Sequence, residues 1–484
     1  MSPSPPSPGS LPDRSRPPAP GRESTVPMPA FDRFAMAHGV PVFVAPRTGV
    51  PLVELELLLD AGGEHNPDHC PGLAAMTAAM IDEGTVRRSG PQLAAELERR
   101  GGTLSCSADW NAARLSLQLL AADLEFGLDL LAELLYEPAF PQHELDRLRQ
   151  QTLAELQRRA DQPASVADEA FAHHLYAGTV FAHPLAGNPA ALASMSRDAL
   201  VEFHQARYRL ARGAIAIAGD FDRARLGAVL AAAFPVAAPA PPDARSATPV
   251  SAAADGPDSP GVSAGPAGGS RDGASGRALR VVVVDRPGAE QTELRIGHLG
   301  VPRRHPDRVG LGILNTLLGG KFTSRINLNL RERHGFTYGA SSRFVDRKTR
   351  GPFVVSTAVS TAAAGRATAE VLGELRRIRA EAVAPAELEE TRNYLLGVFP
   401  YSLQTIEGLS ARLGEIALYG LPLDTPARYL AEVAAIRTED LSRLAQAHLR
   451  PEEALVVAVG PAAELMRQLQ EIAEPELWRS SRPI

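Results

Sequence analysis

The segment from residue 317 to residue 344, LLGGKFTSRINLNLRERHGFTYGASSRF, holds an arginine and a tyrosine at a chemically suggestive spacing. Arg331 is expected late in a helix, and Tyr338 lies just beyond the end of that helix. Side by side over a groove, these side chains would offer guanidinium and hydroxyl donors to a ligand. The spacing alone favours a plainer interpretation, in which Arg331 forms a surface ion pair and Tyr338 packs with its hydroxyl in water.

The residues around this pair predict how it is positioned. Gly319 and Gly320 interrupt an apolar helical pattern, and the next helical run ends in a basic turn, residues 331–334, which suits the negative end of the helix dipole. Gly335 follows, where a left-handed C-cap residue is expected. Residues 336–338 are then predicted to begin a strand.

The bulk composition argues against several classes of function. The chain has 484 residues, of which 44% are hydrophobic, enough for several packed cores. A net charge of −6 with scattered basic residues does not indicate nucleic-acid binding. No run of about 20 apolar residues predicts a membrane span. Cys70 and Cys106 are too few for a disulfide framework or a cysteine metal site, and they indicate a reducing compartment, the cytoplasm.

The chain is organised as two similar halves. Residues 198–219 align without a gap with residues 439–460, so that QARYR lies over QAHLR and AIAIAG over LVVAVG. This internal repeat predicts two homologous domains, residues 31–236 and 279–484. Residues 1–30, rich in Pro and Ser, are predicted to be a disordered tail rather than a secretory signal. The low-complexity residues 237–278 are predicted to be a flexible linker.

The order of predicted elements indicates an α+β fold. Strand pairs separated by helical hairpins favour mainly antiparallel sheets with helices packed on one face. Two α/β-roll-type domains of this kind would form a clam. Residues 34–44 and 53–59 are predicted to form a hairpin. Helices are expected at residues 72–82, 92–100, 123–135, 144–160 and 197–208.

A second candidate for chemistry is the run His65-Asn66-Pro67-Asp68-His69, whose letters suit a metal site. A proline within the run and two glycines before it predict a loop, where side chains four residues apart need not face each other. Solvated or packed histidines are therefore the favoured interpretation here and at His173, His174 and His183.

The two-half layout and its motifs resemble the pitrilysin/insulinase family of zinc peptidases, whose smaller members include the mitochondrial processing peptidase subunits. The resemblance covers residues 31 to about 466. In that family the first helix carries His-x-x-Glu-His, in which two histidines hold zinc and the glutamate activates water. The matching run, GLAAMTAAMIDEGT, places Ala75, Ala78 and Ala79 at those three positions. A methyl group binds no metal and moves no proton.

The family's third zinc ligand is a glutamate on a later helix, and Glu155 matches its position. Alone it cannot hold zinc, because such a site needs at least three protein ligands. Glu155 is therefore expected to be a remnant or a helix-surface carboxylate. No metal or other cofactor is expected on this chain, and zinc is expected on a partner subunit.

The resemblance also gives Arg331 and Tyr338 a role. The family's second domain carries an Arg and a Tyr at the same separation in a sequence similar to LRERHGFTY, and the run with Gly319, Gly320 and Arg325 looks like its glycine-rich loop. The match implies that Arg331 donates to a carbonyl of an extended peptide. It implies that the Tyr338 hydroxyl supports the oxyanion of the tetrahedral intermediate.

In several smaller family members one chain carries the zinc motif and a partner carries the Arg/Tyr pair. The sequence accordingly predicts a non-catalytic, peptide-binding subunit of a heterodimeric zinc endopeptidase, inactive alone. The first alternative is a structural or assembly protein that uses only the fold. The second is a stand-alone hydrolase in which Glu155, Asp161, His173 and His174 converge, although no nucleophile–base signature accompanies them.

Overall fold

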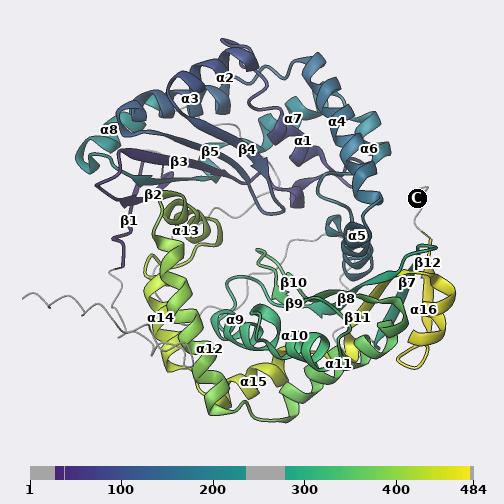
Figure 1. The fold of residues 1–484 in the computed structure, drawn as a ribbon. Helices are drawn as coiled ribbons and strands as arrows, with labels where there is room; N and C mark the ends of the chain where they lie inside the picture. Colours follow the sequence, from purple (N-terminus) through teal and green to yellow (C-terminus); the bar gives the residue numbers. More distant parts are fainter. Residues whose placement is uncertain (1–27, 37–38, 236–277, 480–484) are drawn as a thin grey trace, which may run out of the picture.

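A computed structural model describes residues 28–36, 39–235 and 278–479. Two six-stranded sheets, one in each half, face each other with helices around them (Figure 1). The predicted tail and linker lie outside the described residues, apart from residues 28–30 and 278. Among the described helices, none is long and apolar enough to cross a membrane.

The first sheet has the strand order β1-β2-β6-β3-β5-β4. Its strands are β1 (Asp32–Ala35), β2 (Pro41–Pro46), β3 (Leu52–Leu59), β4 (Thr103–Ala108), β5 (Ala113–Leu120) and β6 (Ala214–Gly219). The second sheet has the order β12-β7-β11-β8-β10-β9. Its strands are β7 (Arg280–Asp285), β8 (Gln291–Leu299), β9 (Ala340–Phe344), β10 (Pro352–Ser360), β11 (Leu455–Gly460) and β12 (Pro475–Trp478).

The two sheets share one topology, which confirms the predicted repeat and fold class. In each sheet a central strand, β6 or β11, pairs parallel with the strand on one side and antiparallel with the strand on the other. The remaining pairs within the shared five-strand core are antiparallel. The outer edges differ, because β1 pairs antiparallel with β2 whereas β12 pairs parallel with β7.

The predicted hairpin between residues 34–44 and 53–59 is wrong. The strand β6 lies between β2 and β3, and the adjacent hairpin partner of β2 is β1 instead. The sequence AIAIAG of β6, like LVVAVG of β11, is buried at every position. A strand that is apolar on both faces is stable only in the middle of a covered sheet, and this separates two strands that are neighbours in the sequence.

The helices of the two halves correspond in order. The first half holds α1 (Leu73–Ala79), α2 (Gly90–Arg99), α3 (Leu124–Tyr136), α4 (Gln142–Ala160), α5 (Pro163–Leu175), α6 (Pro189–Ser194), α7 (Arg197–Arg207) and α8 (Arg223–Ala233). The second half holds α9 (Arg308–Asn315), α10 (Arg325–Asn327), α11 (Ala364–Ala380), α12 (Pro385–Val398), α13 (Ile406–Tyr419), α14 (Thr425–Ala435), α15 (Thr438–His448) and α16 (Ala462–Leu469). Short 3₁₀ turns are η1 (Gly63–His65), η2 (Ala121–Asp123), η3 (Val180–Ala182), η4 (Leu210–Arg212), η7 (Thr361–Ala363), η8 (Phe399–Leu403) and η9 (Pro451–Glu453), and two π-helical turns are η5 (Thr316–Gly320) and η6 (Leu328–Arg333).

The repeat extends to single side chains. Arg149 on α4 donates from its guanidinium to the carbonyl oxygens of Leu192 and Met195, at 3.0 and 2.9 Å. Arg392 on α12 donates in the same way to two carbonyls at the end of α14, those of residues 433 and 436. An arginine that ties a long helix to the end of a later one is therefore part of both copies.

One helix of each half packs on the sheet of the other half, and we call these two helices, α5 and α13, the exchanged helices. In Figure 1, α13 lies against the strands β2, β3 and β6, and α5 lies against β8 and β11. The buried side chains of α13 include Leu409, Leu413 and Ile416, and they pack on residues such as Phe43 of the first sheet. In α5, Phe171 packs among residues of the second sheet. Burying each large apolar side chain stabilises by about 1.5–3 kcal/mol, so this exchange fixes the two halves to each other.

Candidate functional site

The resemblance noted in the sequence aligns the zinc-motif positions of the family with three small side chains of the helix α1. Its chain enters the helix through Gly72, whose φ of +96° is left-handed and whose missing Cβ would lie 2.8 Å from the Ala186 carbonyl oxygen. Ala78 is fully buried, whereas Ala75 and Ala79 are partly exposed on the same side of the helix. No lone pair is available on this face, so α1 cannot ligate a metal.

Glu155 lies on the surface of α4, paired with its own helix. Its carboxylate forms ion pairs with Arg158 and Arg159, and 40% of its side chain is exposed. Among the described residues, Glu155 belongs to no cluster of three or more metal-ligating side chains. Of the two interpretations offered by the sequence, the geometry fits the helix-surface carboxylate.

The run His65 to His69 forms a short 3₁₀ turn and a loop, as predicted. Its second residue, Asn66, accepts a 2.8 Å hydrogen bond from the Ala74 amide and so caps the start of α1. Nε2 of His65 lies 3.1 Å from the Asp60 carboxylate rather than near His69. The run therefore positions α1 and does not form the metal site that its letters suggest.

A lysine from the second half lies among the acidic residues beside His65. Nζ of Lys348, on the loop between β9 and β10, lies 3.0 Å from Asp60, 3.2 Å from Glu64 and 2.9 Å from the Asn111 carbonyl oxygen. Burial alone would raise the pKa of Asp60, but the hydrogen bond with His65 and the charge of Lys348 hold it well below its usual value. The ammonium group thus fills the place that a metal cation would take.

The neighbouring residue, Arg347, is also inserted into the first half. Its guanidinium carbon lies 5.2 Å from the ring centre of Trp110, 4.7 Å from that of Tyr176 and 4.6 Å from that of Phe181. Only 7% of Arg347 is exposed, and burial lowers its pKa. We call Arg347 and Lys348 the clasp. Sequence reasoning missed it, because its partners lie in the other half and no local pattern marks them.

The segment with the Arg/Tyr pair ends its helix as predicted. Gly335 has a φ of +63°, and the Phe336 amide donates to the Leu330 carbonyl at 2.8 Å, closing the last turn. The predicted strand at residues 336–338 is wrong, since β9 begins at Ala340. Thr337 turns its hydroxyl to the Gly339 carbonyl, 2.9 Å away, and this local turn replaces ladder hydrogen bonds.

Arg331 and Tyr338 both lie at the surface, but among the described residues only Arg331 contacts other side chains. The Arg331 guanidinium lies over the Phe322 ring, 4.4 Å from its centre, and 3.7 Å from the Glu332 carboxylate. Tyr338 is 92% exposed. Within residues 278–479, no hydrogen bond or ion pair joins Arg331 to Tyr338. The structure therefore leaves the tyrosine ring unpacked, unlike the plainer interpretation from the spacing, whereas Arg331 forms the surface ion pair that this interpretation expects. A ligand that accepts from Arg331 would have to replace Glu332.

Gly319 and Gly320 close the π-helical turn η5, and the loop proper begins at Lys321. A Cβ on Gly319 would lie 2.3 Å from Oγ of Ser342, so only glycine allows this turn to contact β9. Beyond the loop, Arg325 forms two hydrogen bonds with the Glu387 carboxylate, at 2.7 and 2.6 Å. These contacts fix the loop that carries Phe322, and through it the Arg331 guanidinium.

The residues of the stand-alone hydrolase alternative do not converge. His173 stacks on the Trp478 ring with centres 5.4 Å apart, and the His174 ring meets the same indole edge-on. Nδ1 of His174 lies 3.3 Å from a nitrogen of Arg280. Glu155 is engaged by arginines of α4, as described above. No contact links these histidines to Glu155 in the described part of the chain.

The comparisons with known proteins match both halves. A sequence model described as insulinase, peptidase family M16, matches residues 42–188, and one described as the peptidase M16 inactive domain matches residues 194–395. The uncharacterized zinc protease YmxG of Bacillus subtilis is 19% identical over 90% of this chain and 99% of its own. An uncharacterized zinc protease of Mycobacterium tuberculosis is 25% identical over 81% of this chain and 84% of its own.

Solved structures share the fold. A peptidase M16 inactive domain from Pseudomonas fluorescens has a TM-score of 0.77 at 24% identity, covering 89% of this chain and 98% of that chain. A protease from Helicobacter pylori also has a TM-score of 0.77, at 17% identity, covering 90% and 100%. A chain of Complex III2 from Candida albicans has a TM-score of 0.70 at 13% identity, covering 92% and 100%.

The repeated sheets and these matches define a two-domain protein with a peptidase-like fold. The chain belongs to the insulinase family of peptidases, peptidase family M16.

Proposed function

We propose that this chain is the non-catalytic, substrate-binding subunit of a heterodimeric zinc metalloendopeptidase that acts on peptides or unfolded protein segments. The observation that carries the proposal is the contrast between Ala75, Ala78 and Ala79 on α1 and the surface pair of a partly exposed Arg331 and an almost fully exposed Tyr338. The first group cannot hold a catalytic ion, and the second retains the polar groups that contact a peptide.

Because α1 has no ligand side chains at these positions, we assign the cleavage step to a partner subunit. A catalytic zinc site needs three protein ligands, and α1 supplies none of them. We therefore expect a homologous subunit with an intact His-x-x-Glu-His helix to hold the zinc, with this chain inactive alone. The proposed compartment is the cytoplasm, which the two free cysteines, Cys70 and Cys106, support.

The pair Arg331 and Tyr338 would complete the partner's active site. A guanidinium held over an aromatic ring loses little further freedom when it donates to a peptide carbonyl. The Tyr338 hydroxyl has no competing partner among the described residues and can donate to an oxyanion. Both groups act without a metal on the same chain.

Each sheet of the chain also has an edge strand to which an extended peptide could pair. In the described residues, β4 pairs only with β5 and β9 only with β10. Every second residue of β4, beginning at Thr103, is exposed. An added strand would gain main-chain hydrogen bonds at such an edge, which suits a subunit that binds unfolded segments of varied sequence.

The test is peptide cleavage by this chain reconstituted with its zinc-bearing partner, comparing Arg331→Ala combined with Tyr338→Phe against the unaltered chain. We expect the cleavage rate to fall about 10²–10³-fold, as when an oxyanion donor is removed. The matched control is Arg333→Ala with Tyr401→Phe, which alters an exposed arginine and an exposed tyrosine outside the pair. Unchanged cleavage by an intact assembly of the first variant would contradict the proposed role.

A structural or assembly role is the second candidate. The similarity to a chain of Complex III2 favours it, because the same two-domain fold occurs there in a large complex. In that case Arg331 and Tyr338 would both be idle and only the shape of the fold would be used. The double variant above separates the two candidates, because a scaffold predicts cleavage that does not depend on these side chains.

A further inference from the structure

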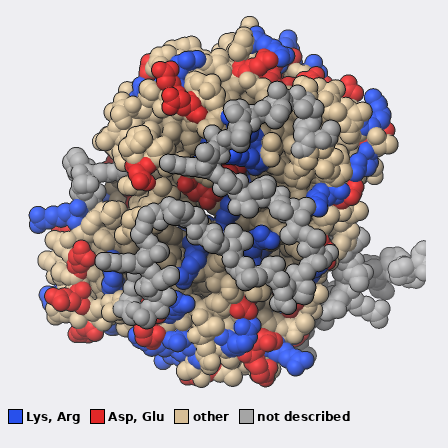
Figure 2. All heavy atoms as spheres, turned by 180° about the vertical axis from the view of Figure 1, so that it is seen from behind, with Lys and Arg blue, Asp and Glu red and all other residues tan. Residues whose placement is uncertain are grey.

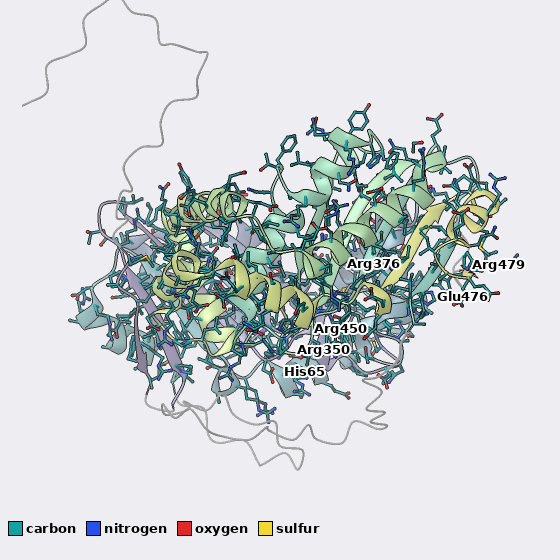
Figure 3. All side chains as sticks on the ribbon, turned by 90° about the horizontal axis from the view of Figure 1, so that it is seen from below. His65, Arg350, Arg376, Arg450, Glu476 and Arg479 are labelled. Carbon is teal, nitrogen blue, oxygen red and sulfur yellow. The ribbon has the colours of Figure 1, made fainter. Side chains whose placement is uncertain are left out.

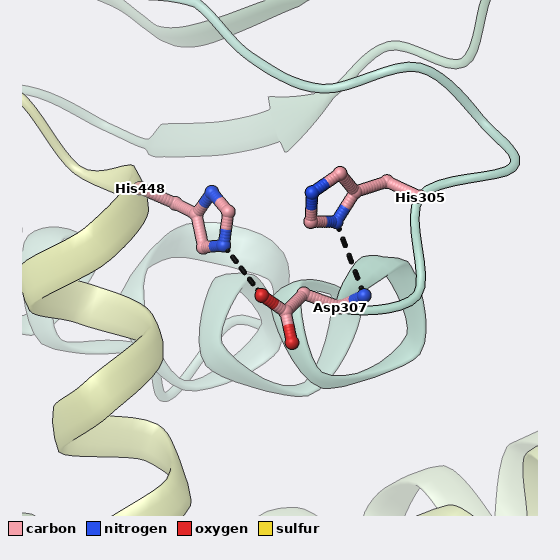
Figure 4. A group of neighbouring side chains, drawn as sticks. All are labelled: His305, Asp307 and His448. Carbon is pink, nitrogen blue, oxygen red and sulfur yellow. Dashed lines mark hydrogen bonds and ion pairs between the residues drawn. The ribbon is translucent and has the colours of Figure 1, made fainter. Parts of the chain in front are cut away.

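Three metal-ligating side chains converge in the second half, far along the chain from α1. His305 and Asp307 lie just before α9, and His448 is the last residue of α15. Ligand atoms of the three lie within 4.8 Å of one another. Figure 4 shows the two imidazole rings side by side, with the Asp307 carboxylate below them in this view. We propose that His305, Asp307 and His448 bind a divalent transition metal of the zinc class.

The donor set suits such an ion. Imidazole nitrogen and carboxylate oxygen are the ligands of zinc sites, and three protein ligands leave a fourth position for water. Nε2 of His448 now lies 2.7 Å from Oδ2 of Asp307. Bond lengths near 2.0 Å place two tetrahedral ligand atoms about 3.3 Å apart. The ion would therefore replace the proton shared by His448 and Asp307 once these two atoms move slightly apart.

Two existing contacts must give way. Nδ1 of His305 accepts a hydrogen bond from the Asp307 amide at 3.1 Å, so this ring must turn to present a free nitrogen. Arg443 pairs with both carboxylate oxygens of Asp307, at 3.0 and 3.3 Å. Its side chain is 58% exposed and can swing into solvent.

Solvent reaches the cluster through a hollow of about 280 Å³ that His305 and His448 help to line. Arg350 and Arg450 line the same hollow, and Figure 3 shows these two next to each other. The ion would therefore have an entry path and room for a water ligand.

At the equivalent place in the first half, a side-chain ammonium group occupies the position that an ion would take. In the aligned repeat, QARYR lies over QAHLR, so Arg207 corresponds to His448. There the cluster of Asp60, Glu64 and His65 contains the Lys348 ammonium, and Arg207 lies 3.9 Å from Asp60. A half-buried lysine fills the first-half cluster, whereas the second half has a histidine in place of Arg207, and the cation beside Asp307 is the largely exposed Arg443.

The test is zinc titration of the full chain against a chromophoric chelator. We expect one bound ion, with affinity reduced at least about tenfold in His305→Ala and in His448→Arg. The second variant introduces the residue that the first half uses and so preserves the pairing with Asp307. His65→Ala is the matched control and should bind as the unaltered chain does.

A further variant separates ligation from a merely structural cluster. Arg443→Ala removes the competitor for the carboxylate, so zinc should bind more tightly to it than to the unaltered chain. Absence of stoichiometric zinc, or zinc that remains equally tight in His448→Arg, would overturn the proposal. The ion lies in the second half, so its loss would leave the proposed peptide-binding role untouched.

Discussion

The two halves of this protein repeat one topology but differ in where reactive side chains survive. In the first half, the face of α1 that the resemblance aligns with the family's zinc motif is built from Ala75, Ala78 and Ala79, and it contributes to packing. In the second half, Arg331 lies within η6 with its guanidinium over the Phe322 ring, and Tyr338 lies beyond the end of η6 with its ring almost fully exposed. A shared fold therefore does not imply a shared chemistry, and the function of each half is decided by a few side chains.

On the face drawn in Figure 2, charge is distributed without a dominant sign. Figure 2 shows basic and acidic residues interspersed over the described part of one face. Such a surface gives no single-sign field for steering a ligand. Recognition must then depend on local groups such as the Arg/Tyr pair and the strand edges.

The largest expected effect concerns the closed face of α1. Ala78→Glu would place a carboxylate where no surface is exposed, and we expect the unfolding free energy to fall by about 2–4 kcal/mol. Ala79→Glu, on the partly exposed side of the same turn, should cost far less. Denaturant unfolding measures the unfolding free energy of both variants. Equal values would show that the Ala78 side of α1 is not buried.

The next effect concerns the clasp that joins the halves. Lys348→Ala leaves the carboxylates of Asp60 and Glu64 without their shared cation, and we expect a loss of about 1–2 kcal/mol. The control is Arg225→Ala, which breaks a fully solvated pair with Glu125 and should cost under about 0.5 kcal/mol. Similar losses for the two variants, measured by thermal unfolding, would remove the clasp from the account.

A smaller effect is a pH dependence of stability where α13 packs on the first sheet. Burial raises the pKa of Glu54 to about 7, and the charge of Glu407 on α13 adds to the shift. The folded state therefore holds this proton more tightly than the unfolded chain does, so stability is full below pH 4.5 and falls as the pH rises to about 7. Glu54→Gln should remove this fall and add about 1 kcal/mol at pH 8, after allowance for solvent screening.

The opposite sign is expected at the other exchanged helix. There Asp168 of α5 lies 2.6 Å from the nearly buried Arg295, so Asp168→Asn should destabilise at pH 8. Denaturant midpoints measured at pH 5 and pH 8 compare the two variants. Equal pH dependence of Glu54→Gln and the unaltered chain would refute the assignment to Glu54.

The smallest expected effect is on stability at the Arg/Tyr pair. Tyr338→Ala should change unfolding free energy by less than about 0.5 kcal/mol, because the side chain is almost fully exposed. The matched variant Tyr208→Ala removes a buried ring of the first half and should cost about 3–5 kcal/mol. A large loss for Tyr338→Ala in the melting curve would mean that the tyrosine is structural.

The sequence alone predicted the parts of this fold that depend on local pattern. The helix end at Gly335 and the buried strands β6 and β11 follow from glycine conformation and apolar runs. The repeat predicted the common topology. The β2–β3 hairpin was wrong, because a strand about 160 residues later in the chain intervenes, and loop closure of that length leaves no local signal.

The contacts between the halves could not be predicted in the same way. The exchange of α5 and α13 and the cage around Arg347 depend on which surfaces meet after both halves fold. The convergence of His305, Asp307 and His448 likewise joins residues from a loop and a distant helix. In the sequence, this cluster is marked only by the correspondence of Arg207 and His448 in the aligned repeat.

One measurement tests the central claim most directly: hydrolysis of an unstructured fluorogenic peptide by the purified chain with zinc present, alone and mixed with its zinc-bearing partner. The account predicts background rates for the chain alone and cleavage by the mixture. Cleavage by the chain alone that a chelator abolishes would contradict it.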